Sequence, residues 1–272
     1  MTPAELFPEI RPWVENLVNV WPAPVIKPQF ASWQVLHLLS LSVLGGATIL
    51  LNLRLIGVGL TDESPSEVHR SLRLWLNLGV VGMIASGVLI GMANAERLYD
   101  SAAFTVKMLG LLAAVIFTYG VSKPAAKADG AVGRGAGVAA LAALTVWAVG
   151  LWVFATTQLI NPGMFHVLTA GALIVGLVLR GRQRWAYIAG LALLLAVQTV
   201  WTHGFIDAED LARLDPVNKA FAWIFGLYVL GFALLPVLRR TRESRPAAAL
   251  VGYAGILMWV SVAAAGRWIA FA

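Results

Sequence analysis

Long uninterrupted apolar runs dominate this chain and leave few folds open to it. Each run approaches the roughly 20 residues that an α-helix needs to cross the hydrocarbon core of a bilayer. Charged residues make up only 12% of the sequence, whereas 59% of it is hydrophobic. A soluble domain carries about a quarter charged residues, so an ordinary soluble enzyme, a disordered chain and a fibrous protein are all disfavoured.

The runs predict an all-α membrane protein with eight transmembrane helices. The predicted spans cover about 32–54, 74–94, 103–122, 136–157, 165–180, 185–203, 218–238 and 247–270. The fifth span is the shortest of them. Small residues within the runs, as at Gly45, Gly46, Gly79, Gly82 and Gly87, predict helix faces that pack closely on other helices.

The segment before the first run predicts a helix that lies on the membrane surface. Apolar residues recur there at helical spacing, at Leu6, Ile10, Trp13, Val14, Leu17 and Val18. This pattern predicts a short amphipathic helix at the interface, with Trp13 and Trp21 as anchors. The segment does not begin basic and turn apolar at once, so no cleavable signal peptide is expected.

Basic residues gather on one side of the predicted bundle. The loops after the first, third, fifth and seventh spans hold the larger share of the 20 lysines and arginines, among them Arg70, Lys123, Arg182 and Arg240. Because basic residues mark cytoplasmic loops, both termini are expected on the periplasmic side of a bacterial inner membrane. Topology thus accounts for the net charge of +6, and no nucleic-acid partner is predicted.

The two halves of the chain resemble each other, which predicts an internal duplication. The run LHLLSLSVLGGATILL aligns with FHVLTAGALIVGLVLR, and this alignment pairs His37 with His166. GMANAE has a counterpart in GFIDAE. Four helices per repeat give both repeats the same orientation, related by an axis along the membrane normal. The predicted units are residues 1–31 as the interfacial segment, 32–160 as the first four-helix repeat and 161–272 as the second.

Three segments carry a resemblance to a known family: LHLLSLSVLGGATILLNLRLIG, SGVLIGMANAERLYDSAAFTVKM and MWVSVAAAGRWIAF. They resemble a family of uncharacterised bacterial four-helix membrane proteins. Its members typically show a first-helix histidine, F-x-x-K at the start of the third helix and a final G-R-W-I, and His37, Phe104 and Lys107 match the first two. The chain is also loosely similar to copper-resistance D-type membrane proteins and membrane b-type cytochromes. The resemblance implies a fused pair of repeats and transfers no settled activity.

Three of the four histidines are expected near the same membrane face. His37 lies about one turn into the first span, His166 starts the fifth, and His203 ends the sixth. An ionisable group within a span is costly without a partner, so all three are candidate cofactor or metal ligands. Neutral imidazole binds iron, copper and zinc. The chain has no cysteine, which excludes disulfides, iron–sulfur clusters and thiolate zinc sites.

Two cations are expected at the same depth as these histidines. Arg267 lies near the outer end of the last span and Lys107 near the outer start of the third. Haem propionates require cations at the membrane face that holds the iron, so the combination favours a b-type haem over a bare metal ion. His37 and His166 are the most economical ligand pair. The alternative is that each histidine only packs at the interface, and that both cations reach lipid head groups.

The leading functional prediction is an electron-transfer protein, or a subunit of a redox complex, with a periplasmic-side haem b. Its expected partners are the lipid bilayer, a quinone, and a periplasmic cytochrome or other redox-complex subunits. Two alternatives stay open. Parallel repeats also fit a transporter of a metal or small solute, and Gly/Ala-rich helix faces fit a cofactor-free structural subunit. Nothing in the sequence decides whether the chain is an enzyme.

Overall fold

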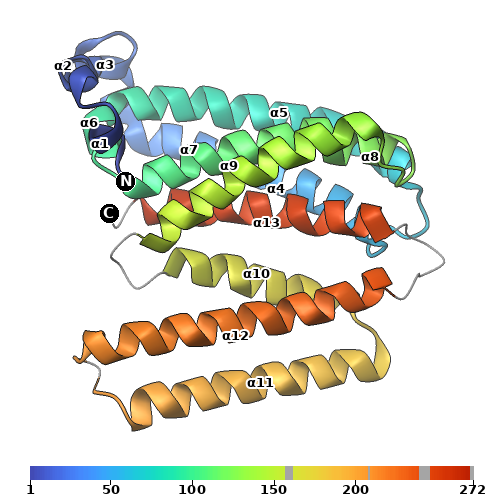
Figure 1. The fold of residues 1–272 in the computed structure, drawn as a ribbon. Coiled ribbons are helices and arrows are strands. Elements are labelled where there is room, and N and C mark those ends of the chain that lie inside the picture. Colours follow the sequence, from blue (N-terminus) through green and yellow to red (C-terminus); the bar gives the residue numbers. More distant parts are fainter. Residues whose placement is uncertain (157–161, 208, 239–245, 270–272) are drawn as a thin grey trace.

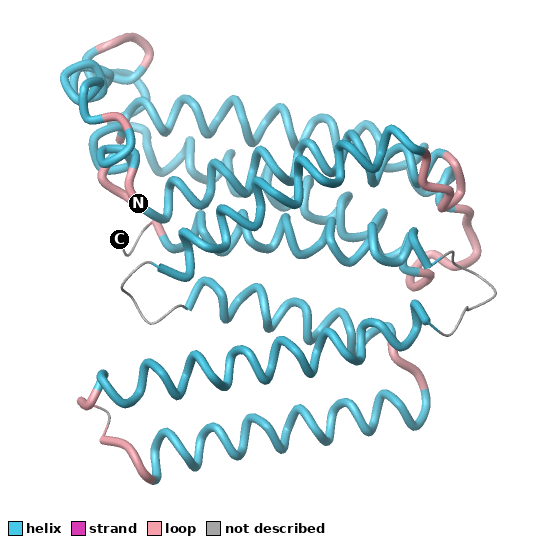
Figure 2. The backbone as a smooth tube through the Cα atoms, in the orientation of Figure 1, coloured by secondary structure: helices cyan, strands magenta, loops and turns pink. Residues whose placement is uncertain are grey.

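The computed structural model is an array of long helices (Figure 1). It describes residues 1–156, 162–207, 209–238 and 246–269, with side chains at all of these positions except 134, 155–156, 162–167, 211, 236–238 and 246. Within these ranges the chain is helix or loop and forms no strand (Figure 2). The prediction of an all-helical fold is therefore confirmed.

Eight long helices occupy the positions of the eight predicted spans. They are α4 (Phe30–Ile56), α5 (Pro65–Ala93), α7 (Ala102–Phe117), α9 (Arg134–Thr156), α10 (Pro162–Val178), α11 (Gly181–Gly204), α12 (Leu211–Leu238) and α13 (Pro246–Trp268). Five short helices complete the order: α1 (Pro3–Leu6), α2 (Arg11–Asn16), α3 (Ala23–Ile26), α6 (Ala95–Tyr99) and α8 (Lys123–Lys127). A π-helical stretch, Thr118–Ser122, joins α7 to α8.

Seven segments are long and apolar enough to cross a membrane. They are Ala23–Ile56, Pro65–Ala93, Ala102–Lys127, Gly135–Phe154, Gly181–Gly204, Ala212–Leu235 and Ala247–Trp268. The expectation of spanning helices is thus confirmed at seven of its eight positions. At the fifth position α10 has 17 residues, fewer than the roughly 20 that a straight crossing needs.

Local sequence signals explain where the first two long helices end and begin. α4 stops at Gly57, which adopts the left-handed conformation at φ 92° that glycine reaches without steric cost. α5 starts with a capping box, in which the Ser64 side chain accepts from the Glu67 amide and the Glu67 carboxylate accepts from the Ser64 amide. Pro65 fits the first turn because its missing N–H would have had no partner there.

The last helix packs in the middle of the molecule. α13 contacts α4 and α7 on one side and α10 on the other, and Figure 1 shows it between the upper helices and α10. Met258 and Trp259 of α13 share one buried core with Leu44 of α4, Leu76 of α5 and Phe117 of α7. α12 packs on α10, and α11 lies beyond α12 at the edge. The predicted second repeat therefore shares its final helix with the core of the first, and the two-repeat symmetry stays a prediction.

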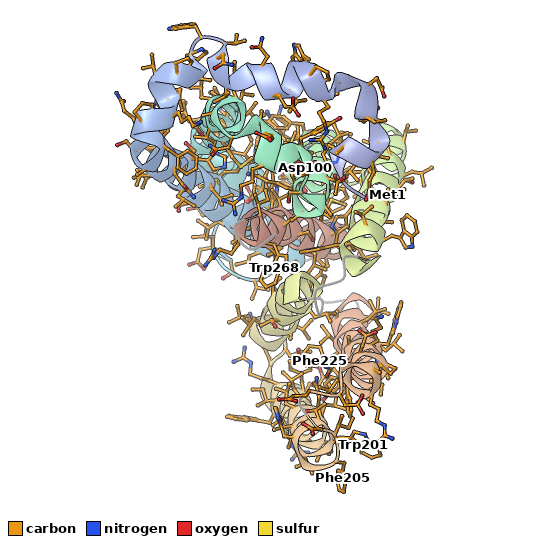
Figure 3. The ribbon with its side chains drawn as sticks, turned by 90° about the vertical axis from the view of Figure 1, so that its left-hand side faces the viewer. Met1, Asp100, Trp201, Phe205, Phe225 and Trp268 are labelled. Atoms are coloured by element: carbon orange, nitrogen blue, oxygen red, sulfur yellow. The ribbon has the colours of Figure 1, made fainter. Side chains whose placement is uncertain are left out.

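Two ends of the bundle differ in composition. Met1 and Trp268 lie at one end, which we call the terminal end (Figure 3). The opposite end, which we call the basic end, holds Arg54, the loop to α5 and helix α8. All the long helices run between these two ends, as helices of a bilayer-spanning protein do. The exposed faces of α11 and α12 are rich in apolar side chains, consistent with contact to lipid.

The N-terminal segment does not form the single amphipathic helix that the sequence predicts. Prolines at positions 8, 12 and 22 interrupt it, and it folds into α1, α2 and α3 with short 3₁₀ turns between them. The segment arcs across the terminal end and is anchored there by Arg11, whose guanidinium lies 2.7 Å from the Asp100 carboxylate. Trp13 and Trp21 are 62% and 79% exposed, as expected for side chains that contact the membrane interface.

Glycines bring α4 and α5 into close contact. The predicted close packing of small residues is confirmed at Gly79 and Gly82. A Cβ at Gly79 would lie 2.7 Å from the Leu44 Cβ, and one at Gly82 would lie 2.6 Å from the Ser40 Oγ. The prediction is wrong for Gly45 and Gly46, where an added Cβ would meet nothing within 4 Å. Successive helical residues point about 100° apart, so Gly45 and Gly46 point away from the contact that Leu44 makes with Gly79.

Candidate functional site

His37 is held in one orientation at the terminal end of the bundle. It lies two turns into α4 and its side chain is 8% exposed. The ring Nδ1 is 2.9 Å from the Ser86 Oγ of α5, and Ser86 itself donates to the Gly82 carbonyl at 2.5 Å. Since the serine proton goes to that carbonyl, Nδ1 carries the ring proton and donates to Ser86. The lone pair of neutral His37 is therefore on Nε2.

Lys107 of α7 reaches the free nitrogen of this histidine. Its Nζ lies 3.5 Å from His37 Nε2, at the outer limit of a hydrogen bond. The lysine side chain is half-buried. None of the ion pairs found in the described part of the chain involves Lys107, so its charge is not neutralised there by a carboxylate. The basic lone pair of His37 and the cation of Lys107 therefore lie next to each other.

Glycines form part of the wall around the His37–Lys107 pair. A Cβ at Gly87 of α5 would lie 3.3 Å from His37 Cε1, closer than most side-chain contacts. At Gly266 of α13 a Cβ would lie 3.6 Å from Lys107 Cε. Four helices thus contribute to the site: α4, α5, α7 and α13. Arg267 follows Gly266 and is exposed at the same end.

The structure brings together two of the five predicted site residues. His37 and Lys107 are in contact, and Arg267 is adjacent to a glycine that touches Lys107. His203 is exposed at the end of α11, far from α4. Figure 3 shows Trp201 and Phe205, which flank it in sequence, at the opposite edge of the molecule from Asp100. The side chain of His166 lies outside the described residues.

The structure also reveals partners that the sequence did not single out. Ser86 is 2% exposed and orients His37, but a serine in a run of small residues carries no signal of its own. One of the three predicted metal ligands, His166, has a side chain outside the described residues. Among the described residues, no three His, Asp or Glu side chains gather closely enough to hold a metal ion.

A second polar group, nearer the basic end, has a structural role. Ser122 donates to the Asn52 Oδ1 at 3.1 Å, and the Asn52 Nδ2 donates to the Thr48 carbonyl at 2.8 Å. The indole of Trp259 donates to the Thr118 hydroxyl at 3.0 Å. Such bonds between buried polar side chains join transmembrane helices. Each donor has an acceptor here, so this group differs from the His37–Lys107 pair, which keeps an uncompensated charge.

The helical array, its seven candidate spans and the intramembrane His–Lys pair define a multi-pass membrane protein. The model of the family of unknown function DUF6644 matches residues 26–163, just over half of the chain, so the chain belongs to that family. The match includes His37, Ser86 and Lys107 and ends before Gly266. No curated protein and no solved structure matches the chain. The predicted membership in an uncharacterised family is confirmed, whereas the similarity to copper-resistance D-type proteins and b-type cytochromes stays a prediction.

Proposed function

We propose that the chain is a membrane electron-transfer protein, or a subunit of a redox complex, that binds a quinol at the His37–Lys107 pair. The quinol is the lipid-soluble electron carrier whose reduced ring bears hydroxyl groups. The proposal places this chemistry at the terminal end, which loop charge predicts to face the periplasm. The observation that carries the proposal is the convergence of His37 Nε2 and Lys107 Nζ without a carboxylate.

The distance between the two nitrogens suits a single shared oxygen atom. With 3.5 Å between them, one oxygen fits at about 2.8 Å from both, a normal hydrogen-bond distance. A quinol hydroxyl placed there donates to the Nε2 lone pair and accepts from the lysine ammonium. An intramembrane charge is costly unless a ligand or partner compensates it, which favours an oxygen that becomes more negative during the reaction.

The same two groups would assist the oxidation of the quinol. Oxidation to the quinone releases two electrons and two protons. His37 Nε2 takes the proton of the hydroxyl that it contacts, and Lys107 stabilises the negative charge that develops on the oxygen. The Ser86 hydroxyl accepts from Nδ1 and so keeps the ring in the tautomer that can act as this base. The second proton goes to water at the terminal end, and the electrons go to a redox partner protein.

Equilibrium titration with a short-chain quinol analogue tests this proposal. Because each variant removes a hydrogen bond to a charged or polar group, His37→Gln and Lys107→Met are expected to weaken binding by about tenfold or more. His203→Gln and Lys219→Met are matched controls, since both residues are exposed and lie on α11 and α12. Controls that bind like the wild type support the site. Unsaturable binding, or equal affinity in all five proteins, contradicts it and favours a structural subunit.

A b-type haem is the second candidate ligand, and the orientation of His37 supports it. The Ser86 bond to Nδ1 leaves Nε2 without a proton and facing Lys107, and metal-ligating histidines likewise have their other nitrogen fixed by a hydrogen bond. When bound, haem would supply one-electron chemistry, and Lys107 and Arg267 would neutralise its propionates. The fit is incomplete, because the described residues provide one axial histidine only. α13 lies between α4 and α10, the helix that carries His166.

A visible spectrum distinguishes the haem from the quinol alone. Gently purified protein that holds haem b shows a reduced α-band after dithionite, and His37→Ala abolishes it. If the protein is colourless and binds quinol with full affinity, the haem proposal is contradicted and the quinol proposal is supported. A metal or solute transporter remains the alternative if elemental analysis finds a metal that depends on His37.

A further inference from the structure

A seam of polar side chains runs between two helical segments at the basic end. α5 contributes one column with a residue every fourth position, and the chain from the π-helical stretch into α8 contributes another. The columns are His69, Arg73 and Asn77 on α5, and Tyr119, Lys123 and Lys127 on the other segment. Residues four apart lie on one face of a helix, and α5 packs against α8. The two columns therefore lie along the contact between these two segments.

A hydrogen bond joins the two columns at their deeper end, and a cation–π contact within the second column lies beside it. The Tyr119 hydroxyl donates to the Asn77 Oδ1 at 2.8 Å. The Lys123 ammonium lies 4.8 Å from the centre of the Tyr119 ring, a cation–π distance. These contacts close the seam toward the membrane core and leave Arg73 and Lys127 exposed nearer the basic end.

His69 adds a buried polar atom without a partner to this basic seam. Its side chain is 4% exposed, and its Nδ1 has no hydrogen-bond partner among the described residues. Lys123, Lys127 and Arg73 are the charges that act on the ring, and all three are positive. A buried nitrogen without a partner is costly and calls for a ligand or a water.

None of the ion pairs found among the described residues involves Arg73, Lys123 or Lys127, although two carboxylates lie at the same end of the bundle. Glu67 accepts from the Ser64 amide at 2.8 Å within the helix cap. Asp129 accepts from the Ser66 amide at 3.0 Å. The positive charges of Arg73, Lys123 and Lys127 thus remain available to an external anion.

We propose that this seam is a binding site for the phosphate group of an anionic phospholipid. Arg73 lies eight residues into α5, about 12 Å from its first residue, within reach of the head-group layer. Leu74, Trp75 and Leu78 of α5 are 59%, 54% and 53% exposed beside the column and provide apolar contact for acyl chains. This apolar flank favours a lipid over free phosphate. Basic pockets between transmembrane helices commonly bind anionic head groups.

Native mass spectrometry of the delipidated full-length chain tests the site directly. Phosphatidylglycerol is titrated against Arg73→Gln/Lys127→Gln and against a control, Arg180→Gln/Arg182→Gln, which removes two exposed charges at the same end. Basic residues near a membrane surface attract anionic lipid, so removing two is expected to weaken lipid binding by about tenfold or more. The control is expected to keep wild-type affinity, and phosphatidylcholine is expected to bind weakly to all three proteins.

Two results would overturn the assignment. Equal loss of phosphatidylglycerol affinity in both double variants would mean that only general surface charge attracts the lipid. Displacement of the lipid by millimolar inorganic phosphate, with matching thermal stabilisation by phosphate alone, would make free phosphate the ligand. Neither result depends on the quinol proposal, because the seam and the His37–Lys107 pair lie at opposite ends of the bundle.

Discussion

A hydroxyl of α5 orients the His37 ring. Ser86 accepts from Nδ1 while it donates to the Gly82 carbonyl, so Nε2 keeps its lone pair. Ser86→Ala removes that acceptor and loosens the orientation of the ring. Because a hydrogen bond contributes about 0.5–1.5 kcal/mol, we expect quinol affinity to fall by about two- to tenfold.

The matched control for this change is Ser42→Ala. Ser42 also lies on a long helix and donates to a carbonyl one turn earlier, but it is exposed. Titration of both variants with the same quinol analogue measures the effect. If Ser86→Ala bound like Ser42→Ala, the serine would have no orienting role.

Arg11 provides a test of how the N-terminal segment is attached. Its hydrogen bond to Asp100, with the attraction of that carboxylate, raises the pKa of the guanidinium above its ordinary value, so the cation persists at all working pH values. Arg11→Ala is expected to speed amide hydrogen exchange in residues 3–19. The free energy of unfolding should change little, because both side chains are substantially exposed. Unchanged exchange there would mean that other contacts hold the segment.

The sequence predicted the membrane face at which each site residue lies better than it predicted which residues lie side by side. His37 and Lys107 were expected at one face, and the structure brings them into contact. The end of α11 that carries His203 also lies at this face, as expected, but on the far side of the array. Position along a span fixes the height of a residue, whereas the packing order of the helices fixes its place around the bundle. That order is not encoded in local apolar patterns.

Close packing of α13 on α4 depends on two glycines of α13. A Cβ at Gly252 would lie 2.4 Å from the Asn52 carbonyl oxygen, and one at Gly255 would lie 2.6 Å from the Asn52 Oδ1. Gly252→Ala must therefore move one helix away from the other. Overpacking of this kind costs about 1–3 kcal/mol, so the variant is expected to unfold at a lower temperature in detergent.

Gly45→Ala is the control for the helix packing, because nothing lies within 4 Å of its added Cβ. Alanine is the better helix former, so this variant should be neutral or slightly more stable. Thermal unfolding followed by circular dichroism compares the two. Equal melting temperatures for both variants would show that α13 and α4 separate without cost.

The element boundaries were largely predictable, and the exceptions have physical causes. Continuous apolar runs located all eight long helices, since spanning the bilayer requires length and apolarity. The N-terminal apolar spacing suggested one helix, but its prolines divide it into short pieces. The sequence also could not show which glycines mark helix contacts, because Gly45 and Gly79 differ only in the direction that they face.

The topology of the whole molecule rests on whether α10 crosses the membrane. If all eight long helices cross, Asp62 lies at the basic end and Asp207 at the terminal end, on opposite sides of the bilayer. The chain has no cysteine, so Asp62→Cys and Asp207→Cys each introduce a single thiol. In spheroplasts, an impermeant maleimide is expected to label only Asp207→Cys, and Asp62→Cys only after permeabilisation. Labelling of both from one side would mean that α10 does not cross.

At the scale of the whole molecule, the central position of α13 is what the sequence could not reveal. The helix is apolar on most of its faces and packs on both sides, against α4 and α7 and against α10. When a helix has no polar face, its sequence does not indicate which side packs against which neighbouring helix. The predicted division at residue 161 therefore holds along the sequence but not in the packing of the helices. Met258 and Trp259 of α13 pack in the core formed with α4, α5 and α7, and Gly266 lies beside Lys107.

The most direct test of the central claim is photo-crosslinking with an azido-quinone, followed by peptide mapping. The account predicts adducts on the segments of α4 and α7 around His37 and Lys107. An excess of unlabelled quinone should suppress them, and Lys107→Met should remove them while Lys219→Met does not. Adducts spread over the lipid-facing α11 and α12 and insensitive to competition would contradict a specific quinol site.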